Sequence, residues 1–507
     1  MSLNLALLVR ESARVHPDRI VLVAGPATMT YATLDEQARR FGAALRQLGV
    51  GPGDRVALML PNTPHFSIAY FGTLYAGAVV VPLNVLLTGP EVAYHLADSH
   101  SKALVAWDGF LAPARAGFTE WGDSDHLIVV SAGETPELGH KERDFGALLG
   151  DVEPIEHLPA TTAEDTAVIL YTSGTTGKPK GAELTQFNMF FNAHYTRTML
   201  LQLSPETVAL ATLPLFHSFG QTVMHNAVLG AGGTVVLLAR FDASAALELM
   251  QQHGVTFFGG VPTMYFAMLN HPDAEQYDVS SLEYCVSGGS AMPVEVMKAF
   301  DEKYGVNILE GYGLSETSPV ASFNQLDRPK KVGSVGLPLW GVDFRLEDAD
   351  GKVVTGTDEP GEICIRGHNV MKGYLGRPDA TKEAIRDGWF HSGDIGVRDE
   401  DGYYFIVDRM KDMVIRGGFN VYPREIEEVL YAHPAVAEAA VIGVPHPSHG
   451  EEIKAILALK QGVEADADEI VEFCKTRLAA YKYPRVVEFV AELPKGPTGK
   501  ILKRELR

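Results

Sequence analysis

Residues 168–181 read VILYTSGTTGKPKG, and the interpretation of the whole chain starts from this stretch. Its first four residues, Val168–Tyr171, are apolar and β-prone, which predicts a buried strand. The next ten, Thr172–Gly181, hold three glycines, three threonines, one serine and two lysines. Glycine lets backbone N–H groups converge on an anion, while hydroxyl groups and Lys180 add donors and positive charge. The pattern therefore predicts a phosphate-binding loop directly after a buried strand.

The loop differs from the phosphate loop of common ATPases and kinases. That motif requires Ser or Thr after Gly-Lys, whereas Gly177 and Lys178 are followed here by Pro179. A flexible surface linker is the plain alternative, but linkers rarely carry so many donors directly after a buried strand. We therefore assign phosphate binding to the following residues: Thr172, Ser173, Gly174, Thr175, Thr176 and Lys180.

Helical and strand patterns alternate on both sides of this loop. Periodicity predicts helices at residues 31–48, 64–76 and 245–252, and short apolar strands at 55–59, 79–81, 208–213, 234–238 and 256–258. This alternation indicates α/β layers with largely parallel sheets. In the last third of the chain, turn pairs such as Asp350-Gly351 and Asp401-Gly402 separate short β-rich pieces, which predicts antiparallel structure.

A chain of 507 residues is too long for one compact core, so at least two domains are expected. We place the boundary in the segment DRMKD, Asp408–Asp412, because a compact α+β pattern follows it. The predicted division is an N-terminal domain at 1–408, a hinge at 409–412 and a C-terminal domain at 413–507. The fold class is therefore α/β: a large domain of layered sheets with a small β-barrel-like part, and a small α+β domain.

Composition and charge exclude several classes of protein. The net charge of −21 disfavours nucleic-acid binding, because a phosphate backbone would be repelled. Cys285, Cys364 and Cys474 are far apart, so no disulfide framework or zinc site is expected and a cytoplasmic location fits. The N-terminal segment lacks the basic stretch and cleavage site of a signal peptide. Glycine and proline interrupt the apolar run Ala69–Leu87, which favours a buried helix and strand over a membrane span.

The segment YTSGTTGKPKG resembles the signature of the adenylate-forming superfamily. This superfamily includes acyl-CoA synthetases, firefly luciferase and the adenylation domains of peptide synthetases. The similarity runs through ordered motifs along nearly the whole chain, from Thr30-Tyr31-Ala32 to Lys503. Within the superfamily, the sequence most resembles the bacterial fatty-acyl-CoA ligases. The resemblance implies an acid–thiol ligase that uses ATP, Mg²⁺ and coenzyme A, with an acyl-AMP intermediate and release of AMP and pyrophosphate.

Three motifs of the large domain acquire roles from this resemblance. His217, in LPLFHSFG, matches a histidine at the carboxylate pocket of the family. The segment SGGSAMP resembles the family's adenine-side loop, and EGYGLSETSP places Tyr312 against adenine, Ser315 or Thr317 near phosphate, and Glu316 on Mg²⁺. The nucleotide-binding residues assigned to these two segments are Gly288, Gly289, Ser290, Glu310, Gly311, Tyr312, Gly313, Ser315 and Thr317.

Further motifs imply a small domain that moves. Asp394, in HSGDIG, matches the acceptor for the ribose hydroxyls, and Arg409 is expected to contact ribose or phosphate. Lys411 matches the family's hinge, Gly417-Gly418 would line a channel for the thiol, and Lys500 matches a lysine that neutralises charge during adenylation. The resemblance therefore divides the chain into an adenylation domain and a mobile lid domain, which rotates between the two half-reactions.

The motifs do not identify the carboxylic acid that the protein would activate. Glycines at 220, 259, 260, 288 and 289 leave room for a long tunnel, with Phe216, Phe219, Val261 and Met264 as its walls. No charged residue in these segments favours a polar acid, so we expect a medium- or long-chain fatty acid, within fatty-acid and lipid metabolism. An aryl acid such as a cinnamate is next. The expected partners are these small molecules alone, with peripheral membrane contact and a homodimer left open.

Three rival functions would also use parts of this pattern. An amino-acid adenylating enzyme with another acceptor would need a carboxylate for the substrate's ammonium group. The sequence Phe241-Asp242-Ala243-Ser244 offers one, but it follows a predicted strand and is read as a strand-to-helix turn. Luciferase-like oxygenation is rare on this scaffold. A non-catalytic nucleotide-binding module is disfavoured by the joint presence of Glu316, Asp394, Arg409 and Lys500.

Overall fold

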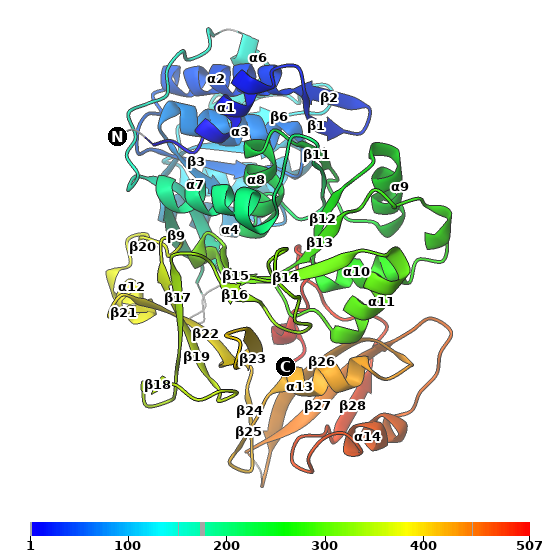
Figure 1. Ribbon diagram of the computed structural model, residues 1–507. Helices are drawn as coiled ribbons and strands as arrows, with labels where there is room; N and C mark the ends of the chain where they lie inside the picture. Colours follow the sequence, from blue (N-terminus) through cyan, green and yellow to red (C-terminus); the bar gives the residue numbers. More distant parts are fainter. Residues whose placement is uncertain (1–2, 151, 173–177, 449) are drawn as a thin grey trace.

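The computed structural model describes residues 3–150, 152–172, 178–448 and 450–507. Its large part carries two long sheets with helices between and around them, and its small part lies at the C-terminal end, in orange and red in Figure 1. A third, smaller sheet links the two parts. The α/β fold class expected from the sequence is confirmed.

The first long sheet has nine strands in the order β16-β15-β14-β13-β12-β10-β11-β1-β2, and its central strands are parallel. Short apolar strands make it up because both of its faces are covered. Their bounds are β1 Ile20–Ala24, β2 Ala27–Thr30, β10 Val208–Ala211, β11 Thr234–Leu237, β12 Phe257–Gly260, β13 Tyr284–Ser287, β14 Asn307–Gly313, β15 Val320–Phe323 and β16 Leu337–Pro338.

The second long sheet has eight strands in the order β20-β9-β8-β4-β3-β5-β6-β7. Strands β3 to β8 are parallel, while β9 returns antiparallel beside β8. The bounds are β3 Arg55–Met59, β4 Val79–Pro82, β5 Ser101–Trp107, β6 His126–Val130, β7 Glu142–Asp144, β8 Thr166–Thr172, β9 Lys180–Thr185 and β20 Gly373–Tyr374.

One apolar core joins the two long sheets through helices α2 and α3, and a second core lies on the opposite face of the second sheet under α4 and α5. The helices of the large part are α1 Leu7–Val15, α2 Tyr31–Gln47, α3 Pro64–Ala76, α4 Gly89–Ser99, α5 Leu111–Trp121, α6 Phe145–Gly150, α7 Gln186–Tyr195, α8 Ala227–Gly230, α9 Ala243–His253, α10 Pro262–Leu269, α11 Val294–Tyr304 and α12 Pro378–Ala384.

The apolar run at residues 69–87 forms the end of α3 and all of β4, as expected. Every residue of α3 from Phe66 to Ala76 is buried, which explains why this helix is hydrophobic all round. A Cβ at Gly72 would lie 2.7 Å from the carbonyl oxygen of Ala38, so α2 and α3 pack backbone to backbone. In the described part of the chain, no helix combines the length and apolarity that crossing a bilayer requires.

The antiparallel structure predicted for the last third of the chain is a six-stranded sheet. Its strands are β17 Val342–Glu347, β18 Val353–Val354, β19 Gly361–Gly367, β21 Ile385–Arg386, β22 Trp389–Arg398 and β23 Tyr404–Arg409. The small part follows, with β24 Val414–Arg416, β25 Phe419–Val421, α13 Pro423–Tyr431, β26 Val436–His446, β27 Gly450–Leu459, α14 Ala467–Lys475 and β28 Val486–Phe489. Its buried residues form cores separate from those of the large part.

Aspartate side chains cap two of the helices. Asp466 accepts a hydrogen bond from the Glu469 N–H at the start of α14, as is typical of an N-cap. Asp242 accepts one from the Ala245 N–H at the start of α9. The sequence Phe241–Ser244 is therefore a strand-to-helix turn, as predicted, and its carboxylate serves the backbone.

Candidate active site

The two ends of the predicted phosphate loop lie side by side. Strands β8 and β9 pair antiparallel, with Thr172 opposite Lys180. The Lys180 ammonium lies 5.3 Å from the ring centroid of Tyr374, in β20 at the edge of the same sheet. Four of the assigned positions, namely Ser173, Gly174, Thr175 and Thr176, lie outside the described residues, as does the adjoining Gly177.

Glu316 is buried beside this loop. The Tyr374 hydroxyl donates to its Oε1 atom at 2.9 Å, and the Thr172 side chain also hydrogen-bonds to the carboxylate. Burial raises the pKa of Glu316, while these hydrogen bonds partly oppose the shift. A carboxylate desolvated next to a phosphate loop gains stability from a hard cation, so its oxygen atoms fit the expected Mg²⁺.

The two hydroxyl groups near Glu316 differ in what they contact. Thr317 is fully buried, and its hydroxyl donates to the Pro319 carbonyl at 2.5 Å while it accepts from the Leu314 N–H at 2.9 Å. Ser315 is only partly buried. Ser315 is therefore better placed than Thr317 to meet a phosphate, and Thr317 shapes the loop.

Tyr312, Asp394 and Arg409 form one polar cluster. The Tyr312 hydroxyl donates to Asp394 Oδ2 at 2.7 Å, and Arg409 Nε lies 3.3 Å from Asp394 Oδ1. Strands β22 and β23 hold the last two residues opposite each other. Asp394 is only 4% exposed, so its carboxylate depends on such donors. A ribose diol could replace them, since a carboxylate accepts two hydroxyl hydrogens at once.

A cavity of about 50 Å³ lies next to this cluster. The glycines Gly288 and Gly289 border it together with Tyr312, and His217, Phe219 and Phe323 form other parts of its wall. Among the described residues that line it, none carries a carboxylate, an ammonium or a guanidinium group. The surroundings suit an apolar group attached to a polar head at His217.

His217 follows β10, as predicted. Burial, with a smaller contribution from the nearby Lys500, lowers the pKa of His217 to about 4. The Phe219 N–H donates to His217 Nδ1 at 3.3 Å, so the proton of the neutral ring sits on Nε2. The neutral His217 ring can therefore donate a hydrogen bond through Nε2.

Lys500 reaches the large domain from the small one. Its ammonium donates to the Gly289 carbonyl at 2.8 Å. The preceding residue, Gly499, has φ +77° and accepts a hydrogen bond from Thr263 Oγ1 at 3.0 Å. Burial and the neighbouring Arg409 lower the pKa of Lys500 to about 7. The structure thus brings Lys500 together with the Gly288-Gly289 loop, the Asp394 cluster and His217.

Gly417 and Gly418 lie away from this site. They form the turn between β24 and β25 with φ +59° and +85°, and a Cβ on either would meet no described atom within 4 Å. Lys411 is exposed in the segment that joins β23 of the large domain to β24 of the small one. The structure therefore presents the Lys500 face of the small domain to the site, with the glycine turn pointing outward.

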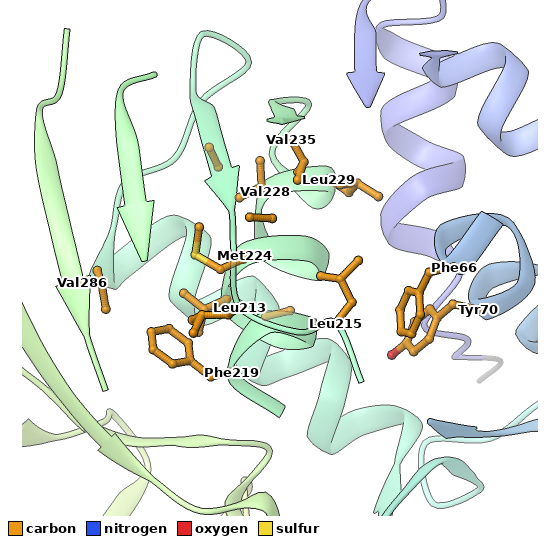
Figure 2. Packing of buried hydrophobic residues seen from close by; sticks show 14 of the residues in the cluster. Phe66, Tyr70, Leu213, Leu215, Phe219, Met224, Val228, Leu229, Val235 and Val286 are labelled. Carbon is orange, nitrogen blue, oxygen red and sulfur yellow. The ribbon is translucent and has the colours of Figure 1, made fainter. Parts of the chain in front are cut away.

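The glycines expected to leave a long tunnel are mostly packed. A Cβ at Gly259 would lie 2.3 Å from the Met224 sulfur, and one at Gly220 would lie 2.4 Å from the Pro214 carbonyl oxygen. Gly260 faces aromatic rings, and Gly288 faces Phe219. Figure 2 shows Met224 between Leu213, Val228 and the cavity-side Phe219. The predicted wall residues other than Phe219, namely Phe216, Val261 and Met264, do not line the described cavity.

The Glu310 side chain binds the backbone of the neighbouring segment SGGSAMP, residues 287–293. Its Oε1 atom accepts from the Met292 N–H at 3.1 Å, and Oε2 has no hydrogen-bond partner among the described residues. Burial raises the pKa of Glu310 to about 7, and Arg424 of the small domain opposes the shift.

Two residues of the site were not anticipated. Tyr374, the partner of Glu316, lies 58 positions further along the chain, and Thr263 holds the backbone of the Lys500 turn. Neither residue type nor local spacing marks them, because their roles follow from strands and loops that meet only in the folded chain. For Tyr374, the sequence offers only a weak indication: a tyrosine next to a glycine after a β-rich segment.

The chain is similar to proteins of known function along nearly its whole length. A family model described as AMP-binding enzyme matches residues 9–375, and one described as AMP-binding enzyme C-terminal domain matches residues 425–500. The long-chain-fatty-acid–CoA ligase of Bacillus subtilis (strain 168) is 37% identical over 99% of this chain and 94% of its own length. A feruloyl-CoA synthase from Amycolatopsis sp is 40% identical over 98% and 96%.

Solved structures agree with these matches. An anthranilate CoA ligase in complex with anthranoyl-AMP superposes with a TM-score of 0.94 and 30% identity, covering 100% of this chain and 96% of that one. A benzoate CoA ligase from Burkholderia xenovorans LB400 gives 0.91 and 30%, covering 99% of both chains. The similar proteins therefore share one type of reaction and differ in the acid that they act on.

Proposed function

The chain belongs to the AMP-binding enzyme family and is an ATP-dependent, AMP-forming acid–CoA ligase; from this premise we propose that its acid is an apolar monocarboxylate, with a medium- or long-chain fatty acid as the substrate. The observation that carries the proposal is the cavity at His217, whose described lining residues have no charged side chain. A second carboxylate or an ammonium group on the substrate would be buried there without a partner, at a cost of several kcal/mol.

The fatty-acid proposal depends on Met224. A site for a ligand of moderate size usually has about 300–1,000 Å³, whereas this cavity has about 50 Å³. Met224 fills the groove over Gly259, and its side chain is unbranched and flexible. A methionine that rotates away would free a narrow channel over a strand position without a side chain. An alkyl chain is thin enough to follow such a channel.

An aryl acid is the second candidate, and a different observation favours it. The cavity is compact and has the rings of Phe219 and Phe323 in its wall, where an aromatic ring gains from edge and face contacts. The relatives include a feruloyl-CoA synthase, and the structural neighbours include anthranilate and benzoate ligases. For such an acid Met224 would stay in place.

The proposed mechanism assigns the described residues to two half-reactions. In the first, a carboxylate oxygen of the acid attacks the α-phosphorus of ATP, an O–P bond forms, and pyrophosphate leaves. The neutral His217 donates through Nε2–H to the carboxylate, and Lys500 stabilises the negative charge that accumulates at the α-phosphate. Mg²⁺, held by Glu316, would neutralise phosphate charge when bound.

In the second half-reaction, the sulfur of coenzyme A attacks the acyl carbon, a thioester bond forms, and AMP leaves with its phosphate. Asp394 and Arg409 would retain the ribose throughout, since they lie opposite each other on β22 and β23, the paired strands that precede the Lys411 segment. Lys500 blocks the side of the site that it occupies. We therefore propose that the lid rotates about Lys411 and exchanges Lys500 for the Gly417-Gly418 turn.

The test is pyrophosphate release with ATP and Mg²⁺ across straight-chain acids from butyrate to stearate, cinnamates, benzoates and amino acids, each with and without coenzyme A. Release with fatty acids, together with formation of the thioester, supports the fatty-acid proposal and gives the preferred chain length. Release confined to cinnamates or benzoates replaces it with the aryl proposal. Turnover of amino acids or dicarboxylates would contradict the apolar assignment.

A further inference from the structure

Two helices at the junction of the domains begin without a capping residue of their own. Helix α11 of the large domain starts after Pro293, and helix α13 of the small domain starts after Tyr422. Neither residue offers the short side-chain acceptor that normally satisfies the first N–H groups of a helix. In Figure 1 the two helices face each other across the junction.

Each helix receives a carboxylate from the opposite domain. Glu428 of α13 accepts a hydrogen bond at Oε2 from the Val294 N–H, the first residue of α11, at 3.3 Å. Asp408, in the last strand of the large domain, accepts one at Oδ2 from the Arg424 N–H near the start of α13, at 2.9 Å. The negative charges also oppose the positive ends of the two helix dipoles.

The residues around these caps are also shared between the domains. The Arg424 guanidinium donates to the Ile406 carbonyl of the large domain, and its Nε lies 3.9 Å from Glu428 Oε1. Asp408 is 6% exposed, and burial raises the pKa of both carboxylates, which the capping hydrogen bonds oppose. Asp408 also accepts at Oδ1 from the Arg409 N–H at 2.7 Å. The N–H groups of Val294 and Arg424, by contrast, have these acceptors only while the domains are docked as here.

The cap on α11 lies next to the anchor of Lys500. Lys500 binds the carbonyl of Gly289, and Glu428 binds the N–H of Val294, five positions further on. The lid therefore holds both ends of the segment 289–294, which borders the cavity at its first residue. A shift of α13 would move Lys500 relative to this segment.

We propose that Asp408 and Glu428 form a reciprocal capping latch that positions the lid, and with it Lys500, for adenylation and that releases when the lid rotates for thioester formation. The proposal rests on the two-position lid described above. Both residues act through Lys500 and the segment 289–294, so they are positioning residues. Their contacts join atoms on opposite sides of the Lys411 segment, and rotation there separates both pairs.

The decisive variant is Glu428→Ala, with Glu425→Ala as its matched control. Glu425 lies on the same helix and has the same charge, but it pairs with Lys482 inside the small domain at 2.7 Å. We expect Glu428→Ala to slow pyrophosphate release about fivefold, the effect of losing one cap, while the thioester rate from preformed acyl-AMP stays equal or rises. Glu428→Gln, which keeps an acceptor oxygen, should recover part of the loss. Glu425→Ala should leave both rates unchanged.

A distance measurement tests the latch independently of any substrate. The three native cysteines are buried, so labels on Glu120→Cys in the large domain and Glu464→Cys in the small domain would be selective. We expect Glu428→Ala to shift the interdomain distance distribution away from the docked state, whereas Glu425→Ala does not. An unchanged distribution, or equal loss of both half-reactions, would overturn the latch. Failure of the acid panel with the native enzyme would instead overturn the proposed substrate.

Discussion

Lys500 of the small domain donates a hydrogen bond to the Gly289 carbonyl of the large domain across 2.8 Å. On the same small domain, Gly417 and Gly418 face open space, since a Cβ on either would meet no described atom within 4 Å. If adenylation and thioester formation use different faces of the lid, this arrangement is the one for adenylation. Substitution of Lys500 should therefore affect adenylation and thioester formation differently.

Lys500→Ala should separate the two half-reactions. Removing one preorganised charge that stabilises a transition state typically costs about 10²–10³ in rate, and we expect a loss of that size in pyrophosphate release. Thioester formation from preformed acyl-AMP should be spared, because the proposed rotation of the lid removes Lys500 from the site before that step. Stopped-flow or quench measurements of each half-reaction provide the check. Equal loss in both would contradict the two-position lid.

The pH dependence of adenylation should report Lys500. Burial lowers its pKa to about 7, so the free enzyme loses the ammonium charge as pH rises through this value. Because kcat/KM reflects groups of the free enzyme, kcat/KM for pyrophosphate release should fall above about pH 7. Thioester formation from acyl-AMP should lack this descending limb. Lys500→Arg keeps its charge at all these pH values, so its lower activity should not decline with pH, and a native profile that stays flat would contradict the assignment.

Met224→Ala tests the channel. The substitution empties the groove over Gly259, so the preferred straight-chain acid should become longer. The buried truncation should also lower the free energy of unfolding by about 2–5 kcal/mol. Met250→Ala is the control, since Met250 is equally buried in α9, whereas the atoms nearest to a Cβ at Gly259 all belong to Met224. It should cost similar stability without changing the chain-length preference, and an unshifted Met224→Ala profile would favour the aryl candidate.

The sequence predicted the parallel core well, because its strands and helices carry strong local signals. The expected ranges for β3 and α3 coincide with the observed elements. In the small domain, the sequence predicted only a compact α+β pattern, whereas β26 runs from Val436 to His446. Its last residues, including Pro445, lack an apolar pattern and extend only because β27 pairs with them. Pairing of this kind is decided by tertiary structure.

In the site, too, local motifs predicted some residues, while others depend on tertiary packing. Motifs located Asp394, Arg409, Tyr312 and Lys500, and the structure brings these four into one region. Motifs did not predict which hydroxyl near Glu316 is committed to the backbone, nor that Met224 occupies the space beside Gly259. Glycine in a sequence removes a side chain, but whether a ligand or a neighbour fills the space depends on packing from a distant segment. For that reason the space expected at Gly259 is occupied by Met224 in this structure.

Glu310→Gln should reveal a buried charge through protein stability. Burial raises the pKa of Glu310 from 4.5 to about 7, so the native state holds this proton more tightly than the unfolded chain does. The native protein therefore loses stability as pH rises from about 4.5 to about 7, and the full penalty, up to about 3 kcal/mol, applies above that range. Glutamine keeps an oxygen for the Met292 N–H and carries no charge.

The melting temperature of Glu310→Gln should consequently exceed that of the native protein by a few degrees at about pH 8, and the difference should shrink at about pH 5. Thermal unfolding followed by fluorescence at both pH values measures this directly. Glu295→Gln is a suitable control, since Glu295 is an exposed carboxylate on the nearby helix α11 and should give no pH-dependent difference. A Glu310→Gln variant that is less stable at both pH values would mean that Glu310 is ionised and stabilised by Arg424 across the domain junction.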